Sequence, residues 1–78
     1  MVQLIDAFEK LGFSLQDDGT YTGYSKDNET IIFEFKNHYL NCNKGNSLLF
    51  SILFAELKLQ TLLILLTEFG IIDETLKK

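Results

Sequence analysis

The chain opens with apolar side chains at helical spacing. Between Val2 and Leu11, apolar residues recur every three or four positions and polar residues fill the opposite side, a pattern that predicts a short amphipathic helix. Gly12 follows directly, and glycine most easily adopts the left-handed conformation that ends a helix. We therefore expect the first helix to end at Leu11.

Residues 13–43 carry the alternating pattern of β-strands. The clearest part is Thr30–Lys36, where large apolar side chains at odd positions predict one buried and one largely solvated face. Asp17-Asp18-Gly19 and Asn37-His38 are typical of tight turns between antiparallel strands. The strands predicted from this pattern are Phe13–Gln16, Thr20–Ser25, Thr30–Lys36 and Tyr39–Asn43.

The segment Ser47–Leu53 is ambiguous, because its apolar residues would point in every direction of a helix and would equally suit a buried strand. We favour a short strand that ends at Phe50, followed by Ser51 as the N-cap of a long helix from about Ile52 to Phe69. Gly70 would then end this helix. The core-facing stripe of the helix would consist of Ala55, Leu59, Leu62, Leu63, Leu66 and Phe69.

A second apolar stripe would lie on the opposite side of this helix. Leu57, Ile64 and Ile71 recur every seven residues and resemble a short heptad seam. Because a helix with two apolar faces needs two partners, the pattern predicts a homodimer or a bound host protein. Each such side chain contributes about 1.5–3 kcal/mol when buried, so a dimer held by these three alone would be weak. The alternative is a sheet that curls round and covers this side within one chain. The predicted interface consists of Leu57, Thr61, Ile64, Glu68, Ile71 and Ile72.

The order of helix, sheet and helix predicts a single α+β domain over residues 1–78. We expect two layers, with an antiparallel sheet of three to five strands and both helices packed on one face, the N-terminal helix short and the C-terminal helix long. An apolar fraction of 46% suits a small globular domain with a hydrophobic core.

The charge and the cysteine content of the chain indicate which binding partners and which cellular compartment to expect. The net charge is −4, and the chain has lysine but no arginine. It therefore lacks the guanidinium group that forms bidentate hydrogen bonds with phosphates and guanine edges. We expect no direct binding of nucleic acid. Glu56, Lys58 and Gln60 interrupt the leucine-rich segment, and charges there oppose a membrane span. A single cysteine, Cys42, and the absence of a basic leader at the start suit a cytoplasmic protein.

Residues that could perform catalysis are few. Cys42 and His38 could form a nucleophile and base only with a third, orienting group, so we interpret them as a strand cysteine and a turn histidine. Asp17-Asp18 and Asp27-x-Glu29 should lie at opposite ends of the sheet. The sequence therefore predicts no enzyme, no metal site and no cofactor. Three tyrosines are expected to pack across strands, with a protein-binding patch as the alternative: Tyr21, Tyr24 and Tyr39.

Several short segments spread over most of the chain carry a resemblance. They are Leu11-Gly12-Phe13, Gly19-x-Tyr21, Ile31-x-Phe33-x-Phe35, Glu56-Leu57-Lys58 and Glu68-Phe69-Gly70-Ile71. In this pattern the chain resembles small uncharacterised phage and prophage proteins of low-G+C Gram-positive bacteria. The resemblance implies an accessory protein with a helix–sheet–helix fold and no assigned active site.

The expected function is binding rather than catalysis. We expect a non-enzymatic accessory protein that occupies a surface of another protein, and the resemblance implies an inhibitor of a host or defence protein, such as an anti-CRISPR protein. The alternative is a structural or assembly subunit that acts by self-association. A third hypothesis, a small hydrolase, would use Cys42 and His38.

Overall fold

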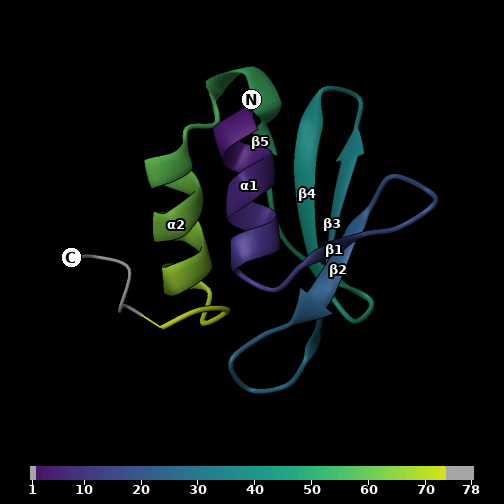
Figure 1. Ribbon diagram of the computed structural model, residues 1–78, viewed down its shortest axis with the longest axis vertical. Coiled ribbons are helices and arrows are strands. Elements are labelled where there is room, and N and C mark those ends of the chain that lie inside the picture. Colours follow the sequence, from purple (N-terminus) through teal and green to yellow (C-terminus); the bar gives the residue numbers. More distant parts are fainter. Residues whose placement is uncertain (1, 74–78) are drawn as a thin grey trace.

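A computed structural model describes residues 2–73 of the protein. In this part of the chain, helix α1 (Val2–Lys10) precedes an antiparallel sheet, and a 3-10 turn (Phe54–Glu56) leads from the sheet to helix α2 (Leu59–Glu68) (Figure 1). The sheet is a meander in which each strand pairs with the next one along the chain. Its strands are β1 (Ser14–Leu15), β2 (Tyr21–Tyr24), β3 (Thr30–Lys36), β4 (Tyr39–Lys44) and β5 (Ser47–Leu53).

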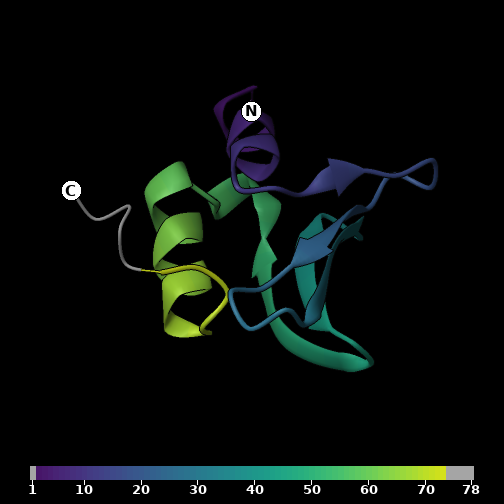
Figure 2. The same ribbon diagram turned by 60° about the horizontal axis from the view of Figure 1, so that its bottom comes forward.

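Both helices lie on the same side of the sheet, as Figures 1 and 2 show. The predicted α+β fold, with an antiparallel sheet between two helices in the chain, is therefore confirmed. We call the side of the sheet that faces the helices the inner face and the opposite side the outer face. Alternate side chains of the central strands fill the inner face and are buried, as the period of two predicts. These side chains are Tyr21, Ile31, Phe33, Leu40 and Cys42.

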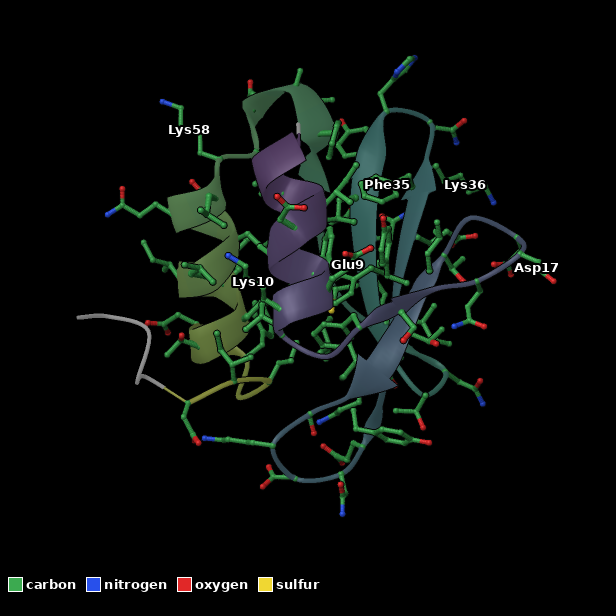
Figure 3. The ribbon with its side chains drawn as sticks, in the orientation of Figure 1. Glu9, Lys10, Asp17, Phe35, Lys36 and Lys58 are labelled. Atoms are coloured by element: carbon green, nitrogen blue, oxygen red, sulfur yellow. The ribbon has the colours of Figure 1, made fainter. Side chains whose placement is uncertain are left out.

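Helix α1 joins the sheet through one aromatic side chain. Phe8 is fully buried, and its ring centroid lies 4.9 Å from that of Tyr21 and 4.8 Å from that of Phe33. Phe35, labelled in Figure 3, approaches the Phe8 ring edge-on at 6.3 Å. Such offset and edge-to-face arrangements stabilise aromatic pairs beyond the area that they bury. Phe8 is thus the main contact between the first helix and the core.

The turns form where the sequence predicts them. Gly12 follows α1 with a φ of +96°, which satisfies the expected left-handed helix end. Asn37 and His38 link β3 to β4 with φ values of +54° and +70°. Two successive positive φ values define the two-residue hairpin turn whose twist matches the flanking strands. This turn fixes the register of β4 against β3, so that Cys42 lies opposite Phe33.

The predicted long C-terminal helix is wrong. All of Ser47–Leu53 belongs to strand β5, and helix α2 begins only at Leu59. Leu53 pairs with Tyr39, and the backbone N–H of Phe54 donates to the carbonyl of His38 at 2.8 Å, so the β-ladder continues past the predicted strand end. The apolar residues in this segment suit a strand that packs on both faces. Such a run cannot be distinguished from a buried helix by periodicity, and the predicted helix therefore began too early.

Ser51 does not cap a helix. It lies inside β5, and its hydroxyl donates to Oδ1 of Asn41 on the neighbouring strand. Helix α2 instead begins after Lys58, which makes no side-chain cap hydrogen bond. Its predicted core-facing stripe is confirmed only in part, because Leu62 and Leu66 are buried whereas Ala55 lies outside the helix and is exposed.

Gly23 on β2 illustrates how tightly the edge of the core is packed. A Cβ atom at this position would lie 2.5 Å from Cδ1 of Phe13 and 3.0 Å from the carbonyl oxygen of Gly12. We expect Gly23→Ala to lower the free energy of unfolding by about 1–3 kcal/mol, because Phe13 is buried and cannot move freely. Urea denaturation measures this change. Tyr24→Ala, at a neighbouring exposed position, is the control and should have a much smaller effect.

Candidate functional site

Cys42 and His38 do not come together. Cys42 is fully buried on the inner face of β4, and desolvation raises the pKa of its thiol to about 12. His38 is exposed in the turn that precedes the same strand. Four positions along an extended strand separate Cα atoms by about 13 Å. A protonated, buried thiol at this distance from the imidazole is a poor nucleophile.

The acidic turns lie at opposite ends of the sheet, as predicted (Figure 1). Asp17, labelled in Figure 3, lies at the β1–β2 turn and points into solvent. The hydroxyl and the N–H of Thr20 donate to Asp18 at 2.7 and 3.0 Å, and these hydrogen bonds lower the pKa of that carboxyl. At the β2–β3 turn, Glu29 pairs with Lys44 at 3.2 Å. Within residues 2–73, no group of three or more potential ligands could hold a metal ion.

A shallow hollow of about 250 Å³ lies on the outer face beside β1 and β2. The side chain of Gln16 faces it, but its Nε2 already donates to the hydroxyl of Thr22 at 2.9 Å and to the carbonyl of Ser14 at 3.1 Å. Its remaining lining is made of small hydroxyl residues, glycines and Tyr24. The hollow therefore brings together no charged groups for chemistry.

The predicted heptad seam does not form. Leu57 precedes α2 and Ile71 follows it, and both side chains are buried in the core, with exposed fractions of 7% and 2%. The backbone also fixes Ile71, since its carbonyl accepts a hydrogen bond from the N–H of Lys26 at 2.9 Å. These two residues are therefore covered within one chain, and neither is exposed for a partner.

The remaining residues of the predicted interface stay on the surface of α2 or beside it. Ile64 is 55% exposed and Glu68 is exposed, whereas Thr61 and Ile72 are half-buried. Ile64 is flanked along the helix by the exposed polar residues Gln60 and Glu68. A single exposed apolar side chain on a polar helix surface is ordinary for a soluble domain. The α2 surface therefore gives only weak support for an interface.

The outer face of the sheet is a broader candidate surface, because neither helix covers it (Figure 2). Tyr24, Tyr39 and Leu48 are 68%, 45% and 59% exposed there. The register places them in different rows across the sheet, with polar side chains between them. The polar residues of this face include Thr22, Glu34, Asn41, Asn43 and Ser51.

Sequence reasoning found part of this surface. It weighed the tyrosines as a protein-binding patch, and two of them, Tyr24 and Tyr39, are exposed while Tyr21 is buried. It missed Leu48, because that residue lies in the ambiguous segment. The pairing of β4 with β5 would have revealed it, because Leu48 lies opposite Asn43 and therefore on the same face of the sheet as that polar residue.

No helix within residues 2–73 is long and apolar enough to cross a bilayer.

Comparisons of the chain with protein-family models, with curated proteins and with solved structures found no match.

Proposed function

We propose that this protein is a non-enzymatic binding protein that acts in the cytoplasm by covering a surface of another protein. The observation that supports this proposal is the outer face of the sheet, which carries exposed tyrosine and leucine side chains among mostly neutral hydrogen-bonding groups. Non-obligate protein interfaces have this mixed composition, and tyrosine is enriched in them.

The electrostatics of this surface favour a protein partner over nucleic acid. The cation that lies beside Tyr39 on the outer face is Lys36 of β3, and Glu34 lies on the same face of that strand. The stacking surfaces that bind single-stranded nucleic acid combine aromatic residues with a continuous positive groove. In a chain of net charge −4 without arginine, a protein surface is the better partner.

The resemblance to phage accessory proteins supports a more specific form of the proposal, an inhibitor of a host or defence protein with an anti-CRISPR-like role. The alternative is an assembly subunit whose partner is chiefly itself. These two functions predict different binding partners, which makes them separable by one experiment.

The experiment is affinity capture from bacterial lysate with the immobilised protein. Three baits are compared: the wild type, a Tyr39→Ala, Leu48→Ser double variant of the outer face, and an Ile64→Ser variant of α2. We expect the wild type and Ile64→Ser to retain the same defined protein. The double variant should retain at least about tenfold less of it, because truncation of each hot-spot side chain lowers the binding free energy by more than about 1 kcal/mol.

Other outcomes would change the assignment. If only Ile64→Ser loses the captured protein, the α2 surface, with Glu68 and Thr61, is the interface. If all three baits retain only further copies of the same chain, the assembly function replaces the inhibitor. All variants alter exposed or half-exposed side chains, so circular dichroism spectra should match that of the wild type.

A further inference from the structure

The hollow beside β1 and β2 has a lining without charge. It is about 250 Å³ in volume and is lined by Gly12, Ser14, Gln16, Thr22, Gly23, Tyr24 and Thr30. Charged residues of the nearby β2–β3 turn form ion pairs with other parts of the chain. Lys26 pairs with Asp73 at 3.8 Å, and Glu29 pairs with Lys44 at 3.2 Å. An ionic ligand would therefore meet no opposite charge on the walls of this hollow.

Gly12 accounts for the open space beside Tyr24. Ser14 of β1 pairs with Thr22 of β2. Gly12 lies two positions before the first of these residues and Tyr24 two positions after the second, so the antiparallel register brings both to the same end of the strand pair. A Cβ atom at Gly12 would meet no other atom within 4 Å. The side chain of Tyr24, which is 68% exposed, consequently has no side chain opposite it on β1.

Gln16 and Thr22 present polar groups in a fixed arrangement. Nε2 of Gln16 donates to the hydroxyl of Thr22 at 2.9 Å and to the carbonyl of Ser14 at 3.1 Å. These two hydrogen bonds orient the amide group and leave its Oε1 as an acceptor for a ligand. The Thr22 hydroxyl accepts from Gln16 and can donate its own proton outward. The hollow thus offers an acceptor and a donor side by side, both uncharged.

We propose that this hollow binds one neutral pyranose ring of a saccharide. A pyranose has a face of C–H groups, which packs on an aromatic ring, and hydroxyl groups around its edge, each of which donates and accepts hydrogen bonds. Tyr24 would contact the C–H face, and Gln16 with Thr22 would bind two adjacent hydroxyls. Sites for drug-sized ligands measure about 300–1,000 Å³, so the smaller hollow suits a single ring.

This site is separate from the residues that the capture experiment tests. Tyr39 and Leu48 lie on β4 and β5, whereas β1 and β2 form the other side of the five-stranded sheet. A variant of the hollow can therefore leave the β4–β5 surface intact. The saccharide proposal and the proposed protein partner consequently fail or succeed independently of each other.

NMR titration of the isotope-labelled protein with D-glucose, D-galactose and N-acetyl-D-glucosamine tests the site. For the best of the three sugars we expect a Kd of about 1–10 mM, since the hollow is shallow and offers few polar groups. The amide signals of Ser14, Thr22 and Tyr24 should shift and saturate, while those of Tyr39 and Leu48 should stay in place. Glycerol, which has hydroxyls but no ring, is the control ligand and should cause no saturable shift.

Two variants assign the contacts. Tyr24→Ala should raise the Kd at least about tenfold, because it removes the aromatic surface. Thr22→Val keeps the branched shape and loses the hydroxyl, and it should raise the Kd at least about threefold. Tyr39→Ala, the matched control, removes an exposed tyrosine from the same face outside the hollow and should leave the Kd unchanged.

Three results would overturn the proposal. The first is the absence of a saturable shift with all three sugars at up to about 50 mM. The second is an equal response to glycerol, which would mean a general effect of hydroxyl compounds on the surface. The third is a Tyr24→Ala variant that binds the sugar as tightly as the wild type, which would place the sugar elsewhere on the protein.

Discussion

Replacing Phe8 with alanine should unfold a large fraction of the protein. The side chain is fully buried, and its ring contacts those of Tyr21 and Phe33, so its loss leaves a cavity between α1 and the sheet. Deletion of a buried phenylalanine costs about 3–5 kcal/mol, and small domains have a total stability of only about 5–15 kcal/mol. Equilibrium denaturation in urea, followed by circular dichroism, measures the change.

Ile5→Ala is the matched control, because it removes an apolar side chain from the same helix at a position that is 43% exposed. We expect this variant to lose less than about 1 kcal/mol. If both variants lost similar amounts, α1 would not be fixed by Phe8, and the inner face of the sheet would need a different cover.

Helix α1 and strand β3 are parts of the fold that could be predicted from the sequence. In α1 the apolar period, the polar opposite side and the terminal Gly12 all indicate the same structure, so the helix and its buried face followed from sequence. The same agreement held for β3, whose predicted bounds, Thr30–Lys36, are those of the structure. Strong local signals are reliable when composition, period and turn chemistry coincide.

The segment from Ser47 to Leu59 could not be predicted, because its local signals conflict. Every residue from Leu48 to Leu53 except Ser51 is apolar, and such a run fits a strand packed on two sides or a buried helix. The tight turn at Gly45 decides the outcome, since it returns the chain alongside β4 and the ladder then extends to Leu53. This pairing is a tertiary effect, which a local pattern does not contain.

The prediction of a heptad seam was wrong for the same reason, because it depended on the bounds of the long helix. Leu57 and Ile71 share a seven-residue spacing with Ile64 only if one helix contains all three, and the short α2 contains Ile64 alone. The chain thus uses two residues of the supposed outer stripe in its own core. The exposed large apolar side chains are instead spread over several elements, with Tyr24, Tyr39 and Leu48 on the outer face of the sheet and Ile64 on α2.

High pH should destabilise the protein through Cys42. The thiol has an ordinary pKa of 9.0, and burial raises its pKa in the folded chain to about 12. Between these values the unfolded chain has lost the proton that the folded chain still holds. The free energy of unfolding therefore falls as pH rises, by about 1.4 kcal/mol per pH unit, whereas below pH 9 the contribution of the thiol is fully present.

The measurement compares urea denaturation of the wild type and Cys42→Ala at pH values from 7 to 11. Every other ionisable side chain is common to both proteins, so the difference between the two curves isolates the thiol. Cys42→Ala should be the less stable protein at pH 7, because it leaves a small cavity opposite Phe33. Its disadvantage should shrink by about 2–3 kcal/mol between pH 9 and pH 11, as the buried thiol of the wild type resists ionisation. Parallel curves over this range would mean that solvent reaches Cys42 in the folded protein and that β4 is less well covered by α1 and α2 than its burial indicates.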